Sequence, residues 1–429
     1  MLRMSGFTAT LRILFGTVLI LVGACSDSAS QRQTLRFWAM GREGEVIAQL
    51  IPEFERRNPD LRVEVQQLPW TAAHEKLLTA FAADALPDLC QLGNTWIPEL
   101  AALNALTALD PLVAKSKVVD AQDYFPGIWD TNVVDGHLHG IPWYVDTRVL
   151  FYRSDLLRKA GFERPPRSWA EWELALDAIK KEVGPARYAI LLPLNEFEPL
   201  LALGLQQDDP LLSKDGQWGN FSGPGFRRAL NFYAGMFRKG WAPAMNNSAI
   251  SNVWTEFGRG YFSFYMSGPW NIEEFKRRLP AQHHGDWMTA PLPGPDGPGA
   301  STAGGSSLVI FRSSRRPQAA WRMIEYLSEP DTQVRFHALT GNLPPRRAPW
   351  RDKQLSHDIY AKAFREQLER ARPTPKVPEW ERIMSEMQLA AEQVVAGGIS
   401  IDEATQSLDR RVDAILEKRR WMLARSRPQ

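Results

Sequence analysis

Cysteine is the scarcest residue of this chain. Only two cysteines occur among 429 residues, too few for a framework of disulfide bonds. Cysteine and histidine nowhere stand at the spacing of a metal-binding motif. His137 and His139, like the pair His283 and His284, lie in polar stretches, which is typical of solvated side chains. The sequence therefore predicts neither a metal site nor a cofactor.

An excess of charge of one sign is also missing. Lys and Arg together number 51 and Asp and Glu 49, which gives a formal net charge of +2. Binding to nucleic acid needs a concentrated basic face, because Lys and Arg neutralise the phosphates. The balanced charge therefore argues against a nucleic-acid partner.

Catalytic signatures are absent as well. The chain has no Ser-His-Asp, zincin or nucleophile-elbow pattern. The stretch from Pro291 to Gly305 is rich in Gly and Pro, but it lacks the Gly-Lys-Ser/Thr ending of a phosphate-binding loop. We therefore expect a protein that is not an enzyme.

Two other classes of protein stay open at this point. A secreted carbohydrate-active enzyme needs only two carboxylates about 5 to 10 Å apart, and no sequence motif enforces that distance. The second open class is a purely structural lipoprotein or adhesin. Product formation from a disaccharide would identify the enzyme, and a failure of every small sugar to change the melting temperature would favour the structural protein.

Long apolar runs are confined to the first residues. Arg3 and Arg12 precede an apolar run from Ile13 to Val22, which is too short to span a bilayer. Positive charge followed by such a run is typical of an export signal. We expect residues 1–24 to be a signal peptide and residues 25–33, which are small and polar, to be a flexible tether.

The end of this run resembles a bacterial lipobox. Small residues, Val22-Gly23-Ala24, stand directly before Cys25. The resemblance implies cleavage before Cys25 and attachment of lipid to its thiol, and a plain secretory signal is the alternative. Cys90 would then have no partner, and its apolar neighbours predict an inert thiol in the core.

The remaining chain is long enough for two domains and has the composition of a globular protein. Hydrophobic residues make up 44% and charged residues 23%, and the sixteen tryptophans are many. Up to Leu103 strands alternate with helices, which indicates βαβ units and a mainly parallel sheet: strands at 35–40, 62–67 and 88–92, with helices at 46–54, 74–83 and 96–103. Pro52 should kink or shorten the first helix.

The ends of two of these strands carry candidate binding residues. Ligands of parallel sheets bind beyond the carboxyl ends of the strands. That rule indicates Arg42 and Glu43 after the first strand, and Asn94, Thr95 and Trp96 after the third.

The stretch from Gly140 to Phe162 combines a predicted buried strand with a helix from Ser154 that ends at Gly161. The strand carries Tyr144, Asp146 and Arg148. Burying a carboxylate and a guanidinium is costly unless they are paired or face a wet cleft. Both an ordinary ion pair and a binding site fit this pattern. A capping box, Ser168 to Glu171, predicts a second helix.

The second half of the chain supplies further rings and basic residues. Trp254 precedes a strand predicted from Tyr261 to Met266, and Gly268-Pro269 end that strand before Trp270 and Asn271. The stretch ending at Gly305 is predicted to return the chain to the first domain, and Leu343-Pro344-Pro345-Arg346 follows a helix at 317–327. The tail at 359–423 is predicted to be amphipathic helix, broken at 373–378 and 397–398.

These segments together resemble the extracellular solute-binding proteins of sugar ABC importers. The segment GIPWYVDTRVLFYRSDLLRKAGF, the turn with Trp270 and the proline-basic pair at Arg346 carry the resemblance, which covers nearly all of the chain after Cys25. It implies an α/β, type II periplasmic-binding-protein fold with two discontinuous lobes and about three crossover segments. The predicted lobes are residues 34–143 with 303–343, and residues 144–302 with 344–429.

The resemblance also implies the ligand, the partners and the location. The branch that carries maltose, trehalose and related α-glucosides is the most similar, while a monosaccharide or another polyol remains an alternative. The partner would be the permease of an ABC importer, and contact with the membrane would run only through the lipid on Cys25. We expect a monomer in the bacterial periplasm or on the cell surface. The predicted ligand-binding residues are Arg42, Glu43, Asn94, Trp96, Tyr144, Asp146, Arg148, Trp254, Trp270, Asn271, Gly305 and Arg346.

Overall fold

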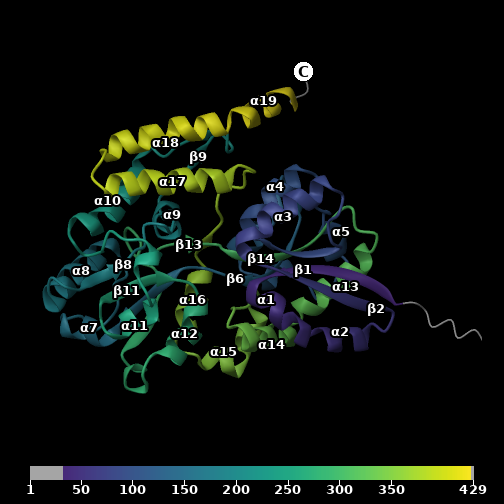
Figure 1. Cartoon of the computed structure of the whole chain (residues 1–429), viewed down its shortest axis with the longest axis horizontal. Coiled ribbons are helices and arrows are strands. Elements are labelled where there is room, and N and C mark those ends of the chain that lie inside the picture. Colours follow the sequence, from purple (N-terminus) through teal and green to yellow (C-terminus); the bar gives the residue numbers. More distant parts are fainter. Residues whose placement is uncertain (1–31, 427–429) are drawn as a thin grey trace, which may run out of the picture.

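The computed structural model describes residues 32–426, so Cys25 and the predicted signal peptide lie outside the described residues. The chain forms two lobes side by side, with α17 (Trp380–Val395), α18 (Ile401–Ile415) and α19 (Glu417–Ser426) along one side (Figure 1). No helix in the described range is long and apolar enough to cross a membrane.

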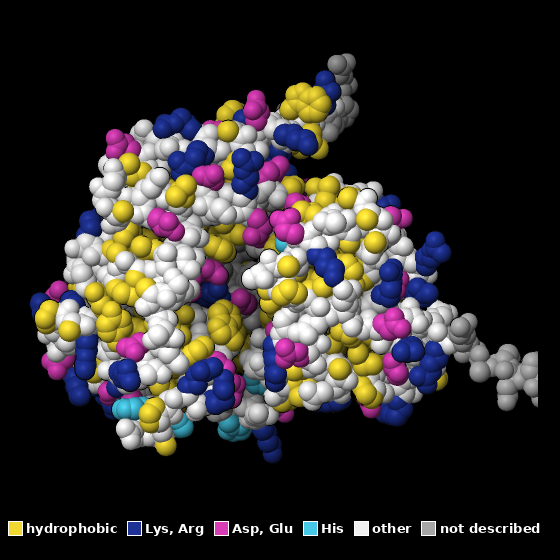
Figure 2. Space-filling model, in the orientation of Figure 1, with side chains coloured by type: hydrophobic (Ala, Val, Ile, Leu, Met, Phe, Trp, Pro, Cys, Tyr) yellow, Lys and Arg dark blue, Asp and Glu magenta, His cyan; other side chains and the backbone are white. Residues whose placement is uncertain are grey.

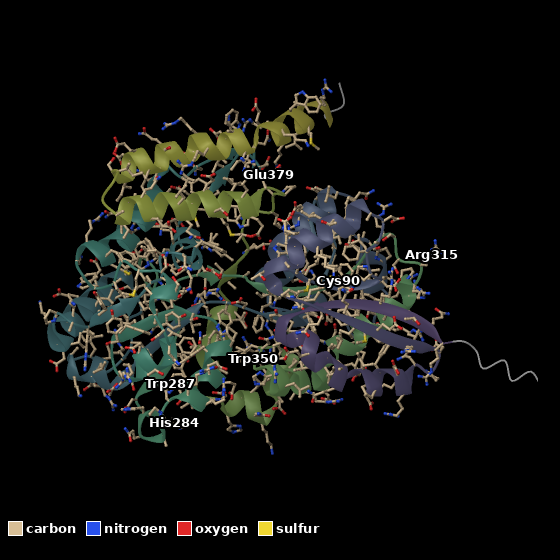
Figure 3. The ribbon with its side chains drawn as sticks, in the orientation of Figure 1. Cys90, His284, Trp287, Arg315, Trp350 and Glu379 are labelled. Carbon is tan, nitrogen blue, oxygen red and sulfur yellow. The ribbon has the colours of Figure 1, made fainter. Side chains whose placement is uncertain are left out.

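The first lobe is built on a five-stranded sheet of order β2-β1-β3-β14-β6. Strand β1 runs parallel to β2 and β3, whereas β14 runs antiparallel to β3 and β6. Cys90 lies inside β3 as a fully buried free thiol, as predicted, and burial raises its pKa (Figure 3). The strands are β1 (Gln33–Met40), β2 (Leu61–Leu68), β3 (Leu89–Gly93), β14 (Gly305–Ile310) and β6 (Ile141–Val145).

Helices flank this sheet, and the predicted break at Pro52 is confirmed. The chain forms α1, then a 3-10 turn, and starts α2 at Ile51, where the missing N–H of Pro52 costs nothing. The elements of this lobe and of the adjoining loops are α1 (Gly41–Val46), η1 (Ile47–Gln49), α2 (Ile51–Arg57), α3 (Trp70–Ala82), η2 (Asn94–Trp96), α4 (Ile97–Ala102), α5 (Asp110–Val113), η3 (Ala121–Asp123), α6 (Pro126–Asp130), β4 (Val133–Val134), β5 (His137–Leu138), α13 (Pro317–Ser328) and α14 (Pro330–Thr340).

The second lobe is built on a four-stranded sheet of order β12-β7-β11-β8. Strand β11 (Phe262–Ser267) pairs antiparallel with β7 (Val149–Arg153) and parallel with β8 (Tyr188–Leu191), and β12 (Trp287–Ala290) forms the edge beside β7. The single strand predicted after Gly140 is therefore wrong. It is two strands, β6 and β7, in different sheets. Both halves are rich in β-branched and aromatic residues, so their pattern does not mark the change of sheet.

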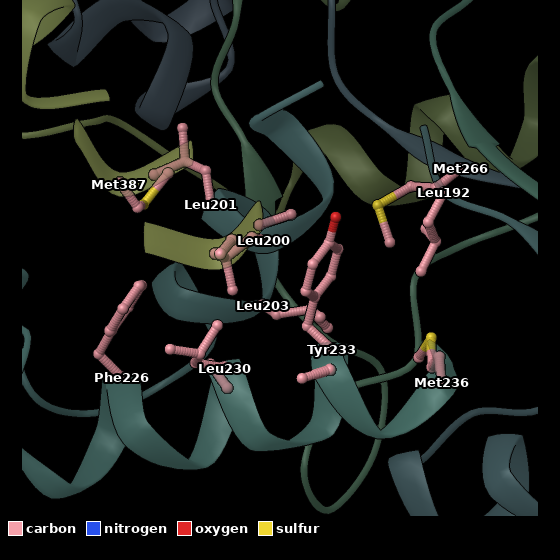
Figure 4. Close-up of a cluster of buried hydrophobic side chains, with 14 of the residues drawn as sticks. Leu192, Leu200, Leu201, Leu203, Phe226, Leu230, Tyr233, Met236, Met266 and Met387 are labelled. Atoms are coloured by element: carbon pink, nitrogen blue, oxygen red, sulfur yellow. The ribbon is translucent and has the colours of Figure 1, made fainter. Parts of the chain in front are cut away.

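A large apolar core fills the space between this sheet and its helices. Figure 4 shows α10 and α9 packing together through Leu200, Leu203 and Leu230, with Met387 of α17 joining them. The elements of this lobe are α7 (Ser154–Lys159), α8 (Trp169–Val183), α9 (Glu198–Leu205), β9 (Leu212–Ser213), β10 (Trp218–Gly219), α10 (Pro224–Arg238), η4 (Asn247–Ala249), α11 (Val253–Gly258), α12 (Trp270–Arg278), η5 (Ala281–His283), β13 (Ser301–Thr302), η6 (Ala348–Arg351), α15 (Lys353–His357), α16 (Ala361–Leu368) and β15 (Ala371–Arg372), with α17 to α19.

The predicted capping box of α8 forms only in part. The Ser168 hydroxyl accepts from the Glu171 backbone N–H at 3.2 Å, but the Glu171 carboxylate accepts from the N–H of Arg167 instead of Ser168. Arg164 also pairs with the Glu171 carboxylate. Together with the Pro165-Pro166 segment, it holds this carboxylate one residue before the N–H that a complete capping box would use.

The connections between the lobes run side by side. The Val145 N–H donates to Leu343 O and the Asp146 N–H donates to Gly304 O, both at 3.0 Å. Gly305 has a positive φ of 132°, and a Cβ there would clash with the carbonyl oxygen of Tyr144. Glycine at this position therefore lets two crossing segments approach backbone to backbone. Figure 1 shows β6 and β13 at this junction.

Candidate functional site

A cleft of about 470 Å³ lies between the two lobes. Figure 2 shows the hollow from one side, with acidic, basic and apolar side chains inside it. This volume is typical of small-molecule sites. The lining residues are Glu43, Trp70, Gly93, Asn94, Thr95, Trp96, Tyr144, Val145, Asp146, Arg148, Phe197, Glu198, Leu201, Trp270, Thr302, Ala303, Gly304, Gly305, Ser306, Asn342, Thr374, Glu381 and Met384.

Glu43 is a buried carboxylate in the wall of the cleft. It lies in the first turn of α1, directly after β1, and is 7% exposed. Asn342 Nδ2 donates to its Oε1 at 2.5 Å, whereas its buried Oε2 has no hydrogen-bond partner among the described residues. Burial raises the pKa of Glu43. A buried acceptor without a partner is a place where the donor of a ligand can bind.

Tyr144 presents a fixed hydroxyl near Glu43. Its oxygen accepts from Gln91 Nε2 at 3.2 Å and from Ser306 Oγ at 3.0 Å. Both acceptor positions are thereby used, which leaves the O–H proton of Tyr144 to donate elsewhere. Burial raises the pKa of Tyr144 well above its usual value, so the hydroxyl stays protonated.

The rim on the first lobe is formed by η2 and α3. Asn94 Nδ2 donates to Ala303 O at 2.6 Å. The ring of Trp96 packs edge-on against Trp70, with centroids 5.6 Å apart, and its centroid lies 5.1 Å from that of His74. His74 is in turn 2.6 Å from Glu99, and this hydrogen bond raises the pKa of His74. The rings of Trp70, His74 and Trp96 therefore hold one another in place at this rim.

Asp146, Arg148 and Glu198 form an ion-pair cluster at the junction of the lobes. Arg148 donates to Asp146 and, at 2.5 Å, to Glu198 at the start of α9. Burial favours the neutral form of Arg148, but the two carboxylates outweigh it and raise its pKa. Burial raises the pKa of Asp146. Burying a carboxylate and a guanidinium is costly unless they are paired or face a wet cleft. Here the charges are paired with one another, and they also line the cleft.

Trp270 projects from the first residue of α12 and is 39% exposed. Its ring lies against Gly268, where any Cβ would clash with it, so the glycine makes room for the ring. The guanidinium carbon of Arg148 lies 4.7 Å from the ring centroid. An exposed ring of this kind offers an apolar surface to a ligand in the cleft.

Trp254 and Asn271 do not line the cleft. Trp254 Nε1 donates to Asn271 Oδ1 and Asn271 Nδ2 donates to Ser267 Oγ, both at 2.7 Å. Arg278 lies 4.2 Å over the Trp254 ring. These side chains brace the turn that carries Trp270, so the structure gives them a supporting place instead of the predicted contact.

Arg42 and Arg346 are also placed away from the cleft. Arg42 is exposed on α1 and pairs with Glu45 at 3.3 Å. Successive helical residues point in different directions, so Glu43 turns inward while its neighbour Arg42 does not. Arg346 is buried and donates to Asp123 at 2.7 Å and to the carbonyl of Ser328. Its segment runs beside residues 123–125 and not along the cleft.

The other predicted residues do line it, and the structure adds several that the sequence did not indicate. Glu43, Asn94, Thr95, Trp96, Tyr144, Asp146, Arg148, Trp270 and Gly305 are the predicted ones. The additions with polar or aromatic side chains are Trp70, Phe197, Glu198, Thr302, Ser306, Asn342, Thr374 and Glu381. Glu198 and Glu381 start helices, where a carboxylate is ordinary, so no pattern distinguished them.

The arrangement offers rings and hydrogen-bonding groups on both sides of a cleft. No group of three or more His, Cys, Asp or Glu side chains within residues 32–426 is placed to hold a metal ion. A second cavity of about 600 Å³ lies apart from the rings, beside Val134, Leu205 and Arg372.

Comparison with known proteins agrees with this architecture. The family model of the bacterial extracellular solute-binding proteins matches residues 40–334. The diacetylchitobiose binding protein DasA of Streptomyces coelicolor is 24% identical over 356 residues, 81% of this chain and 81% of the relative. The sugar-binding protein MalE of Xanthomonas citri is 60% identical, with a TM-score of 0.90 over 92% of this chain and 100% of that structure.

A more distant solved structure shares the fold alone. Maltose-bound MalE3 of T. maritima is 23% identical, with a TM-score of 0.73 over 89% of this chain and 99% of that structure. These likenesses confirm the predicted α/β fold with two lobes.

Proposed function

This chain is a member of the bacterial extracellular solute-binding proteins, and from that premise we propose that it captures a sugar for an ABC importer. The observation that carries the proposal is the cleft between the lobes, where rings and fixed polar groups converge from both sides. The 60% identity to the sugar-binding protein of Xanthomonas citri supports the same class of ligand.

The proposed ligand contacts combine stacking with hydrogen bonds. The apolar face of a sugar ring would stack on Trp270, and Trp70 and Trp96 would cover a second ring. Hydroxyls would donate to the unpartnered Oε2 of Glu43 and accept from the O–H of Tyr144. Such donor and acceptor pairing sets specificity.

We propose an α-glucoside disaccharide, such as maltose or trehalose, as the ligand. The rings line the cleft from both lobes, with Trp270 in the second lobe and Trp70 and Trp96 in the first, which suits two sugar units better than one. The maltose in the structure of T. maritima MalE3, a protein of the same fold, fits this choice. A monosaccharide or another polyol is the alternative.

The proposed working cycle takes place outside the cytoplasm. The lobes, assigned as residues 34–143 with 303–343 and 144–302 with 344–429, would close on the sugar, and the loaded monomer would dock on a membrane permease driven by an ATPase. Lipid on Cys25 would be the only attachment to the membrane. The anchor can be tested by mass spectrometry of the mature chain: acyl groups on Cys25 are expected, and a mature chain without them would contradict the anchor.

Catalysis fits this cleft less well than binding does. Asp146 and Glu198 both accept hydrogen bonds from Arg148, so each of these carboxylates already has a protein partner. Glu43 and Glu381 line the same cleft, so incubation with maltose and trehalose followed by analysis for glucose tests the enzyme directly. We expect no glucose to be released.

Calorimetric titration with glucose, maltose and trehalose tests the binding function. We expect at least one disaccharide to bind more tightly than glucose. Trp270→Ala should weaken that binding by on the order of 1–3 kcal/mol, about tenfold or more. Trp421→Ala, in an exposed ring of α19 outside the cleft, is the matched control and should bind like wild type. Equal affinity for glucose, or an unaffected Trp270→Ala, would refute the disaccharide proposal.

A further inference from the structure

Thr95 and Glu381 join the two lobes directly across the cleft. The Thr95 hydroxyl donates to Glu381 Oε1 at 2.5 Å, although the two residues are 286 positions apart in the chain. Thr95 belongs to η2, at the end of β3 in the first lobe, and Glu381 is the second residue of α17 in the second. Both side chains line the cleft. Thr95 is one of the candidates that the rule for strand ends indicated, whereas Glu381 was not predicted from the sequence.

The hydroxyl of Thr95 is held in place by its neighbours on both sides. Asn94 is fixed to the Ala303 carbonyl at 2.6 Å, and Trp96 packs on Trp70 and His74. The 3-10 turn that contains Thr95 is thus tied to the crossing segment on one side and to α3 on the other. A donor mounted in this way has a defined direction.

Glu381 is mounted with similar rigidity. The adjacent Trp380 is 1% exposed, and α17 packs along α18 and α10 in the core of the second lobe. Figure 3 shows Glu379, directly before this helix, at the end of α17 that faces the first lobe. Met384, one turn further on, also lines the cleft.

The carboxylate of Glu381 depends on such a donor. Burial raises the pKa of Glu381, and the hydrogen bond from Thr95 acts in the opposite direction by stabilising the charged form. The basic side chain whose charge acts on it is His74, which is hydrogen-bonded to Glu99. Without Thr95 the carboxylate would be free to rotate, and the two lobes would lose a charge-assisted contact at this point.

We propose that Thr95 is a positioning residue, which fixes the Glu381 carboxylate for the ligand and, in the empty protein, favours the arrangement in which the two lobes touch at this hydrogen bond. Its effect on the ligand rests on the proposed function, whereas its effect on the empty protein does not. A protein that is already partly closed binds more tightly, because less of the binding free energy is spent on closure.

The test removes the hydroxyl and then restores it. Thr95→Val keeps the shape of the side chain without the donor, Thr95→Ser keeps the donor, and Thr79→Val on the exposed face of α3 is the control. Thr95→Val should weaken disaccharide binding by about tenfold, the loss expected for a hydrogen bond to a charged group. Thr95→Ser and Thr79→Val should bind nearly as wild type. Small-angle scattering without sugar should give a larger radius of gyration for Thr95→Val alone.

A double-mutant comparison separates positioning from direct contact. If Thr95 acts through Glu381, adding Thr95→Val to Glu381→Ala should cost almost no further affinity. A full further tenfold loss in that background would mean that Thr95 acts on the sugar itself, and the proposal would be overturned. An unchanged radius for empty Thr95→Val would overturn it as well. If no sugar binds wild type, the proposed function fails, and the scattering of the empty proteins still decides the closure bias.

Discussion

Single carboxylates in the cleft reduce the stability of the empty protein. Burial raises the pKa of Glu43, Asp146 and Glu381 in the folded state. For a group with a raised pKa, the contribution to stability is fully present below the unfolded pKa and is lost as the pH rises through the folded pKa. These three groups therefore make the folded state less stable at neutral pH than in mild acid, a cost that a ligand with suitable donors would offset.

Glu43→Gln should accordingly raise the melting temperature at pH 7. Gln keeps an oxygen for Asn342 but removes the buried charge. The gain should shrink toward pH 4, because the wild-type carboxyl then takes up a proton. Calorimetric melting from pH 4 to pH 8 measures this difference. Glu45→Gln, an exposed neighbour on the same helix, is the control and should change little. A Glu43→Gln protein that is less stable at pH 7 would contradict the account.

Gly305→Ala should destabilise the protein by about 2 kcal/mol or more, because the new Cβ would clash with the Tyr144 carbonyl at a positive φ. Urea unfolding measures the free energy of unfolding. Gly297→Ala is the matched control, since a Cβ there meets nothing within 4 Å. Similar stability of the two variants would mean that the crossing segments can move apart freely.

Some site residues could be predicted from the sequence and others could not, for physical reasons. Glu43 and Asn94 follow strands of a parallel sheet, so the rule for strand ends located them. Glu198 and Glu381 begin helices far along the chain, and only the fold brings them to the cleft. Arg346 was misassigned because its sequence does not reveal that Asp123 lies beside it.

At the scale of elements, α17 and α18 form a helical pair that carries Glu381 over the cleft. Their turn contains a complete capping box, in which Ser400 accepts from the Glu403 N–H and Glu403 accepts from the Ser400 N–H. Leu408 and Val412 of α18 are fully buried against the core. The pair is therefore anchored by packing along its length and by its cap at the turn.

Ser400→Ala should lower the free energy of unfolding by about 1 kcal/mol, because an N–H at the start of α18 loses its acceptor. Chemical denaturation measures the loss. Glu403→Gln is the control, since Gln also completes a capping box. If Ser400→Ala were as stable as wild type, solvent would be replacing the cap.

Periodicity predicted most elements but not how they are shared between sheets. Pro52 and Gly161 marked ends that the structure confirms, because their backbone properties act locally. The division between β6 and β7 was missed, since Asp146 to Arg148 carry neither Gly nor Pro and the chain stays extended. Such a change of sheet is decided by tertiary pairing with β14 on one side and β11 on the other.

At the scale of the whole molecule, the two sheets are joined by neighbouring crossing segments near Val145, Gly304 and Leu343. Narrow junctions of this kind allow hinge motion between lobes. The order of the segments and their resemblance to a family were enough to predict this architecture. The contacts across the cleft, such as Thr95 with Glu381, depend on side-chain placement that the order of segments does not determine.

Closure on ligand should be visible by small-angle scattering. Wild type with saturating disaccharide should have a smaller radius of gyration than wild type alone, because the sugar bridges the lobes. The decrease should be larger for Thr95→Val, which starts more open. An unchanged radius in both proteins, with binding verified by calorimetry, would contradict hinge closure.

The place where a sugar binds in crystals tests the proposed binding site. Crystals grown with maltose and, separately, with trehalose should show a sugar between the lobes, with one ring stacked on Trp270 and a hydroxyl donating to Glu43 Oε2. The second cavity, beside Val134, Leu205 and Arg372, should contain no sugar. A sugar bound only in that second cavity, or at the surface with the interlobe cleft empty, would contradict the account.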